Sequence, residues 1–246
     1  MKKVALVTGG NRGIGRAIAE ELAKKGISVA ITYCYHEQEA NEVKKYLADN
    51  YNVSVMVYKC DISKEADVKN MVSDIQNTFG NIDILVNNAA TCKDSLFMDK
   101  SIADFKRILD VNIVGSYLVS KYVGKIMYEN KKGKIVNISS TNAIDTYYPE
   151  SCDYDASKAG VISLTHNMAR EFAPYIAVNC VCPGWVNTDM NSELTPLQRD
   201  EYNKKILLGR FANPQEIAKV VVFLTSDDAS YINDSIIRVD GGKFNE

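Results

Sequence analysis

A tyrosine and a lysine stand four residues apart in the stretch YDASKAG, which spans residues 154–160. If this stretch is helical, Tyr154 and Lys158 lie on one face of the helix, one turn apart. A phenol has an ordinary pKa near about 10, and a nearby cation lowers that pKa by stabilising the ionised form. The pair therefore predicts a group that donates and accepts a proton, although a packed core aromatic would show the same spacing.

A glycine-rich segment, TGGNRGIG, follows the first apolar run of the chain. Glycines let a backbone turn sharply and come close to a ligand, and a helix that begins here would offer unpaired N–H groups to a pyrophosphate. The segment therefore predicts a dinucleotide site, with a purely structural turn as the alternative. The residues assigned to this site are Gly9, Asn11, Arg12, Gly13, Ile14 and Gly15.

The end of the second apolar run bears on the choice of dinucleotide. Folds that bind NAD usually place an acidic side chain there, bonded to the ribose 2′-OH. Here Tyr33 occupies that place, and Glu37 comes later. Arg12 could bind a 2′-phosphate through two hydrogen bonds, although a solvated surface charge is the competing interpretation. We therefore expect NADP(H) as the cofactor, with NAD(H) as the alternative.

Apolar runs alternate with amphipathic segments along the whole chain, and the runs are continuous, as in a parallel sheet covered on both faces. The pattern predicts an α/β fold: a single doubly wound Rossmann domain over residues 1–246, with a seven-stranded parallel sheet flanked by helices on both faces. The expected strands are 3–8, 27–33, 53–60, 82–88, 133–139, 175–182 and 235–241. The expected helices are 13–25, 37–50, 64–79, 102–129, 154–172 and 214–225. The polar stretch 184–213 is expected to be an irregular segment, either a functional lid or disordered.

The composition of the chain indicates which broad class of protein it belongs to. The 246 residues are 46% hydrophobic and 24% charged, with a formal net charge of -2, which favours a globular protein over one that binds nucleic acid or a membrane. No run approaches the roughly 20 apolar residues of a membrane helix. Six scattered cysteines without a C-x-x-C pair predict no metal site and reduced thiols in a cytoplasmic protein.

Six motifs occur in a fixed order: TGGNRGIG, NNAA, ISS, YDASK, PGWVNTDM and a terminal VDGG. In this order they resemble the signature of the short-chain dehydrogenase/reductase family over nearly the whole chain, and most closely that of its bacterial 3-oxoacyl-acyl-carrier-protein reductases. The resemblance implies NADPH-dependent reduction of a ketone to a secondary alcohol, on a small-molecule or acyl-carrier-bound substrate. It also implies a homotetramer, or a homodimer, built through the long helices and the C-terminal strand.

The resemblance also implies the roles of individual residues. Tyr154 would be the general acid in reduction and the base in oxidation, and Lys158 would also hold the ribose hydroxyls of the nicotinamide. Ser140 would bond the substrate carbonyl oxygen, with Ser139 as the alternative. Asn112, in the segment LDVNIVG, would hold a water in the proton relay to the lysine.

Further cofactor contacts follow from the same resemblance. Asp61 would bond the adenine amino group, with Ile62 beside the ring. Asn88 and Ala89 would pass near the adenosine ribose. A segment after the sixth strand would fix the nicotinamide carboxamide, and its assigned residues are Pro183, Gly184, Val186 and Thr188.

The chain departs from the family pattern beside the expected substrate pocket. Residues 141–153 form a segment that is one residue longer than in the acyl-carrier-protein reductases, and Ala143 stands where a glycine is usual. A dehydrogenase for a sugar, a polyol or another small alcohol or ketone therefore stays open as an alternative. A non-catalytic dinucleotide-binding regulator is a remote one, because Tyr154 and Lys158 are both present.

Overall fold

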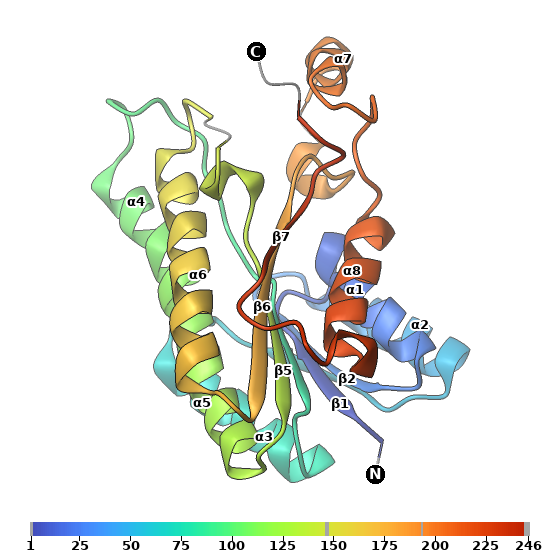
Figure 1. Cartoon of the computed structure of the whole chain (residues 1–246). Helices are drawn as coiled ribbons and strands as arrows, with labels where there is room; N and C mark the ends of the chain where they lie inside the picture. The colour runs from blue at the N-terminus through green and yellow to red at the C-terminus, as the bar shows by residue number, and fades with distance from the viewer. Residues whose placement is uncertain (1, 146–147, 193, 244–246) are drawn as a thin grey trace.

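The computed structural model describes residues 2–145, 148–192 and 194–243 (Figure 1). Seven parallel strands form one sheet in the order β3-β2-β1-β4-β5-β6-β7. The strands are β1 (Val4–Val7), β2 (Ser28–Tyr33), β3 (Val55–Lys59), β4 (Ile84–Asn87), β5 (Gly133–Ile138), β6 (Ile176–Pro183) and β7 (Ile236–Val239). The α-helices are α1 (Gly13–Lys24), α2 (Glu37–Tyr51), α3 (Glu65–Phe79), α4 (Ile102–Leu109), α5 (Ser116–Glu129), α6 (Cys152–Glu171), α7 (Pro196–Lys204) and α8 (Pro214–Thr225).

Helices cover both faces of the sheet, which confirms the predicted doubly wound α/β fold. Figure 1 shows α1, α2 and α8 on one face and α3, α4, α5 and α6 on the other. Strand β1 pairs in parallel with β2 on one side and with β4 on the other, so the direction of winding reverses at β1. Ligands of such sheets bind beyond the carboxyl ends of the strands at this reversal.

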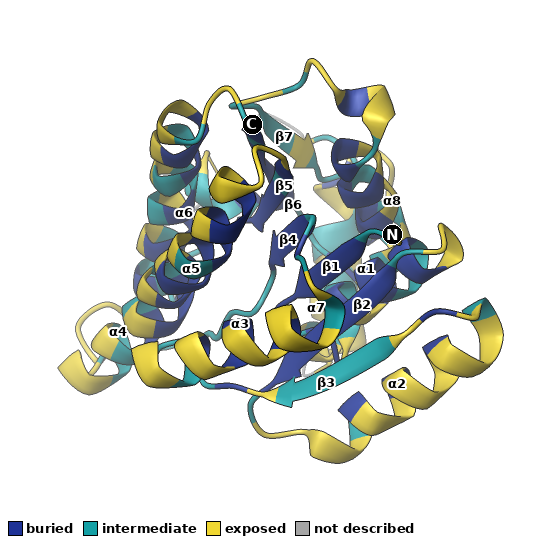
Figure 2. Cartoon of the chain, turned by 90° about the horizontal axis from the view of Figure 1, so that it is seen from below, coloured by how far each residue is buried: buried dark blue, intermediate teal, exposed yellow. Residues whose placement is uncertain are grey.

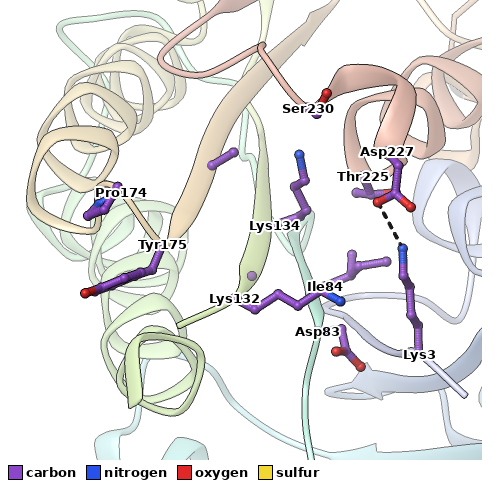
Figure 3. A pocket seen from close by; sticks show the side chains of 12 residues that line it. Lys3, Asp83, Ile84, Lys132, Lys134, Pro174, Tyr175, Thr225, Asp227 and Ser230 are labelled. Carbon is purple, nitrogen blue, oxygen red and sulfur yellow. Dashed lines mark hydrogen bonds and ion pairs between the residues drawn. The ribbon is translucent and has the colours of Figure 1, made fainter. Parts of the chain in front are cut away.

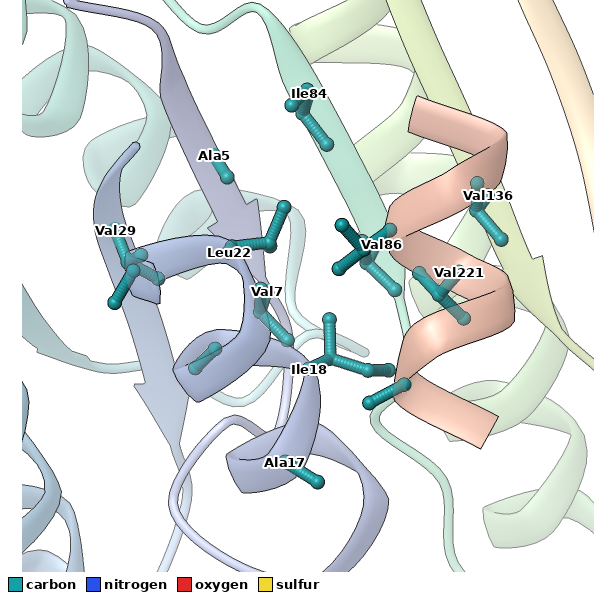
Figure 4. Close-up of a cluster of buried hydrophobic side chains, with 14 of the residues drawn as sticks. Ala5, Val7, Ala17, Ile18, Leu22, Val29, Ile84, Val86, Val136 and Val221 are labelled. Atoms are coloured by element: carbon teal, nitrogen blue, oxygen red, sulfur yellow. The ribbon is translucent and has the colours of Figure 1, made fainter. Parts of the chain in front are cut away.

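Each face of the sheet has its own hydrophobic cluster. On the first, Ile18 and Leu22 of α1 and Val221 of α8 pack on β1 and β4, and all three side chains are fully buried (Figure 4). On the second, Met71 of α3 and Met127 of α5 are likewise fully buried. Burying each such side chain contributes about 1.5–3 kcal/mol. Figure 2 shows that the buried residues follow the sheet and the inner sides of the helices, whereas the outer side of α2 is exposed.

The stretch 184–213 differs from the prediction. It contains α7, so the expectation of an irregular segment is wrong for residues 196–204. The helix begins with a reciprocal capping box between Thr195 and Gln198 and has Pro196 in its first turn, both strong start signals. No residue of α7 is buried, and the polar stretch therefore lacks the apolar periodicity that reveals most helices.

The helix expected over residues 102–129 is interrupted. Between α4 and α5, the chain forms a π-helical turn over Asp110–Gly115. Such turns are rare, and they occur frequently at functional sites. This one contains Asn112, which the sequence assigns to the active site.

Candidate active site

The loop between β1 and α1 is bonded to the end of β4. The Thr8 hydroxyl oxygen accepts hydrogen bonds from the backbone N–H groups of Asn88 and Ala89, at 2.9 and 3.0 Å. The side-chain amide of Asn88 donates to the carbonyl oxygens of Thr8 and Gly9, at 2.9 and 3.1 Å. The structure thus joins Gly9, Asn88 and Ala89, which the sequence assigned separately to the cofactor site.

The start of α1 has the shape and polarity of a phosphate cradle. A Cβ atom on Gly15 would lie 2.2 Å from the carbonyl oxygen of Gly9, so only glycine fits there. Gly13 has a φ of +54°, which favours glycine. The helix N-cap is Arg12, and within the described chain no side chain caps the first turn. Its free N–H groups and the close backbone approach fit the pyrophosphate of a dinucleotide.

The segment after β6 comes back to this cradle. The N–H group of Gly184 donates to the carbonyl oxygen of Val239, at 3.1 Å, which fixes the chain as it leaves Pro183. Val186 is buried, and Thr188 lies next to the glycine loop, since a Cβ atom on Gly13 would be 3.4 Å from its Cγ2 atom. The predicted pyrophosphate and carboxamide segments therefore lie side by side.

The expected adenosine side of the cradle holds a mixture of charges. Arg12 is exposed, whereas Tyr33 is buried at the end of β2. Burial, and then the carboxylate of Glu37, raises the pKa of Tyr33. The Asn11 amide donates to the Glu39 carboxylate at 3.2 Å, so an acidic group also lies near the loop. Ile14, the remaining residue assigned to the loop, is partly buried and packs against the core beneath the loop.

The side chains of Asp61 and Ile62 both contact other residues of this chain. The Asp61 carboxylate accepts hydrogen bonds from the Ser63 hydroxyl at 2.6 Å and from the Arg107 guanidinium at 3.3 Å. Burial acts to raise the pKa of Asp61, but these bonds outweigh it and lower the pKa. Ile62 is buried against Gly115, where a Cβ atom would lie 2.6 Å from its Cγ1 atom. Ile62 is thus part of the core, and the contact of both residues with adenine stays a prediction.

The proposed acid, its lysine and the two serines meet where β5 faces α6. The Lys158 ammonium donates to the carbonyl oxygen of Ile138 at 2.8 Å and lies 5.5 Å from the centroid of the Tyr154 ring. Ser140 lies close enough to Tyr154 to lower the pKa of its phenol, whereas the Ser139 hydroxyl donates to the backbone carbonyl of Lys158 at 2.8 Å. This division favours Ser140 over Ser139 as the serine that faces substrate.

The expected effect of the lysine on the tyrosine is wrong for this structure. Burial raises the pKa of Tyr154, nearby groups such as Cys92 and Asp155 raise it further, and the neighbouring Ser140 only partly opposes them. Burial also lowers the pKa of Lys158, to about 8. Desolvation disfavours the charged form of both groups, and it is the largest influence on the pKa of each.

Asn112 lies within the π-helical turn and is buried. Its side-chain oxygen accepts from the Thr91 N–H group at 2.9 Å, and its amide donates to the Thr91 carbonyl at 3.0 Å and to the Ser157 hydroxyl at 2.9 Å. Asn112 therefore joins the segment after β4 to α6, the helix that carries Tyr154 and Lys158. Its predicted water contact remains a prediction.

Three supporting residues were missed from the sequence. Thr8, Thr91 and Ser157 each make hydrogen bonds to a residue assigned to the site. Thr8 and Ser157 lie inside quoted motifs, and a small hydroxyl residue at a strand end or beside a catalytic pair is the signal that could have marked them. Thr91 acts through its backbone, which no residue type reveals.

The described chain has other features away from this site. A pocket at the opposite, amino-terminal end of the strands is lined by Lys3, Asp83, Lys134 and Asp227, among others (Figure 3). Among residues 2–145, 148–192 and 194–243, no group of three histidine, cysteine or acidic side chains could hold a metal ion. No helix in the same part of the chain is long and apolar enough to cross a membrane.

Comparison with known proteins matches nearly the whole chain to one family. Residues 9–243 match a family described as enoyl-(acyl carrier protein) reductase. The 3-oxoacyl-[acyl-carrier-protein] reductase FabG of Aquifex aeolicus is 41% identical over 98% of this chain and 97% of its own length. The FabG of Haemophilus influenzae is 38% identical over 98% of both chains.

Solved structures agree with the sequence comparisons. Levodione reductase superposes with a TM-score of 0.93 and 32% identity, covering 98% of this chain and 96% of its own. A mutant of a Serratia marcescens short-chain dehydrogenase/reductase gives a TM-score of 0.92 and 35% identity, covering 98% and 97%. The glycine cradle, the Tyr154–Lys158 pair and these likenesses lead to one conclusion: the chain belongs to the short-chain dehydrogenase/reductase family, whose members are NAD(P)-dependent oxidoreductases acting on the CH–OH/C=O pair.

Proposed function

We propose that the chain reduces a ketone to a secondary alcohol with NADPH, and that its substrate is a 3-oxoacyl thioester. One observation carries the reaction: Ser140, just beyond the carboxyl end of β5, lies close enough to Tyr154 to lower the pKa of its phenol, and the Lys158 ammonium is 5.5 Å from the tyrosine ring. Two hydroxyls that converge in this way can both reach one carbonyl oxygen.

In this reaction the protein stabilises and then neutralises the negative charge that forms on the carbonyl oxygen. When bound, the nicotinamide supplies the hydride to the carbonyl carbon. The Ser140 hydroxyl stabilises the negative charge that develops on oxygen, and Tyr154 donates the proton. The raised pKa of Tyr154 keeps the phenol protonated near neutral pH, which is the form that a donor needs. Lys158 lies one turn along α6 and would hold the nicotinamide ribose.

The thioester substrate rests on the relatives, because the FabG proteins of similar sequence are 3-oxoacyl-[acyl-carrier-protein] reductases. One observation favours a compact cyclic ketone as the second candidate. Trp185, which follows β6, stacks on Tyr202 of α7 with ring centroids 4.4 Å apart, and Tyr148 packs on its edge at 6.5 Å. Flat aromatic rings suit a small apolar ring, and levodione reductase is a structural relative.

The remaining parts of the proposal concern assembly and location. A homotetramer, or a homodimer, is supported by the exposed side chains of Val114 and Tyr117 beside α5, which are 40% and 49% exposed. A cytoplasmic location is consistent with six free cysteines.

An activity panel tests the substrate. We expect oxidation of NADPH, followed by its absorbance, to be faster with acetoacetyl-CoA than with a cyclic diketone or a ketose. If only the cyclic diketone is turned over, the substrate is a compact cyclic ketone and not a thioester. A lack of turnover with every ketone would contradict reduction itself.

Removal of the Tyr154 hydroxyl tests the acid. We expect Tyr154→Phe to lower kcat by about 100-fold to 10,000-fold, because the reaction loses its proton donor. Binding of NADPH, measured by fluorescence titration, should be unchanged. Tyr231→Phe, at a fully exposed position distant in the chain from α6, is the matched control and should behave as wild type. Wild-type turnover by Tyr154→Phe would show that another group protonates the product.

Removal of the Arg12 charge tests the cofactor. We expect Arg12→Ala to raise the KM for NADPH by about 10-fold to 100-fold and to leave that for NADH unchanged, since only NADPH has a 2′-phosphate. Arg16→Ala is the control, because Arg16 is one turn further along α1 and lies 5.9 Å from the Tyr46 ring. Equal losses with both cofactors would exclude a phosphate contact.

The lowered pKa of Lys158 predicts a pH dependence of stability. Between about 8 and its ordinary value of 10.5, the unfolded chain binds a proton at Lys158 and the folded chain does not. The free energy of unfolding of the cofactor-free protein should therefore rise by roughly 2 kcal/mol from about pH 7.5 to about pH 10, relative to Lys158→Met. Urea denaturation at both pH values measures this difference. Parallel behaviour of the two proteins would mean that folded Lys158 stays charged throughout.

A further inference from the structure

One ion pair of the described chain is withdrawn from water, and it lies beside the catalytic tyrosine. The Lys100 ammonium is 3.1 Å from the Oδ2 atom of Asp153, and these side chains are 3% and 0% exposed. Every other ion pair between described residues leaves at least one side chain 34% exposed or more. The pair joins the loop that precedes α4 to the first turn of α6.

The two residues are links in a longer chain of contacts. The Lys100 ammonium also donates to the carbonyl oxygen of Lys93, so it closes the loop on itself. The other oxygen of Asp153, Oδ1, accepts from the backbone N–H group of Tyr154 at 2.9 Å. The carboxylate therefore satisfies a first-turn N–H group of α6, where the helix dipole favours negative charge.

A second bond joins the same two segments. The N–H group of Ser95 donates to the carbonyl oxygen of Glu150 at 2.8 Å. The loop of residues 91–100 is thus bonded at two places to the segment that leads into α6. At its start, Thr91 is held by Asn112, which also bonds Ser157 of α6.

Stability alone is a weak reason for such an ion pair. Taking two charges out of water costs about as much as their attraction returns, and apolar pairs of similar size often stabilise a protein more. The 3.1 Å contact between the Lys100 ammonium and Asp153 Oδ2 does not have the geometry of a hydrogen bond. The pair therefore contributes still less to the stability of the fold. The remaining advantage of the pair is that it fixes the position of the two segments that it connects.

We propose that Lys100 and Asp153 are positioning residues, a tether that holds the loop of residues 91–100 against α6 and thereby sets the place of Tyr154. The tether acts on the backbone of the proton donor and touches neither substrate nor cofactor. Displacing a reacting group by about 1 Å can cost a factor of about 100 in rate. This inference rests on the proposed role of Tyr154 as the acid.

The test is the double variant Lys100→Met, Asp153→Asn. Methionine keeps the length of the lysine stem, and asparagine keeps an acceptor for the Tyr154 N–H group, so only the charged link is cut. We expect kcat for the ketone that the enzyme reduces fastest to fall by about tenfold or more, with the KM for NADPH within about twofold of wild type. The midpoint of urea denaturation should stay close to the wild-type value, because no unpaired charge is left buried.

The single variants and a control complete the experiment. Each single variant, Lys100→Met or Asp153→Asn, leaves one buried charge without its partner. Both should therefore be less stable than the double variant, and their kcat should fall at least as far. The control is Lys3→Met with Asp227→Asn, an exposed pair that also joins distant segments, and it should keep wild-type kcat. The tether is refuted if the double variant, folded, has kcat within about twofold of wild type. Failure of the acid assignment is seen separately, as full activity of Tyr154→Phe.

Discussion

The site depends on a close approach of two backbones at the point where the sheet reverses its winding. The carbonyl oxygen of Gly9 lies where a side chain on Gly15 would begin, and the Asn88 amide bonds that same oxygen at 3.1 Å. The loop after β1 is thereby held on the end of β4, and the free N–H groups at the start of α1 face outward. A larger residue at position 15 would push the loop away from β4, and the phosphate cradle and the segment that contains Ala89 would separate.

The catalytic helix is fixed to the same sheet by buried polar groups. The Asn87 amide of β4 donates to the Asn137 side chain of β5 at 2.8 Å, and the Asn137 amide donates to the Thr165 hydroxyl of α6 at 2.8 Å. Buried hydrogen bonds of this kind fix one relative position, because any other leaves a polar group unpaired at a cost of about 1–3 kcal/mol. The bond from Lys158 to Ile138 adds a contact at the active end of the helix. The ends of β1 and β4 and the face of α6 are therefore joined into one support for the proposed cofactor site and the proposed acid.

The sequence predicted the parts of the molecule whose geometry demands particular residue types at short spacing. The glycine loop, the Tyr154–Lys158 pair and the alternation of strands and helices are of this kind. The predicted direction of the Tyr154 pKa shift was wrong, because burial, which elements distant in the chain produce, is the largest influence on this pKa. Helix α7 was missed for lack of an apolar face. The Lys100–Asp153 contact was beyond prediction, since neither residue belongs to a motif and the fold alone brings them together.

The aromatic residues around Trp185 form a connected group. Tyr148, in the segment between Ser140 and Tyr154, has its hydroxyl 3.3 Å from that of Tyr202 in α7, and both rings contact Trp185. Two segments that the sequence analysis places separately beside the expected substrate pocket are therefore joined through one tryptophan. A substitution in either segment changes the support of the other, so their effects on substrate preference should not add. An exchange of specificity with a relative would require both segments together with position 185.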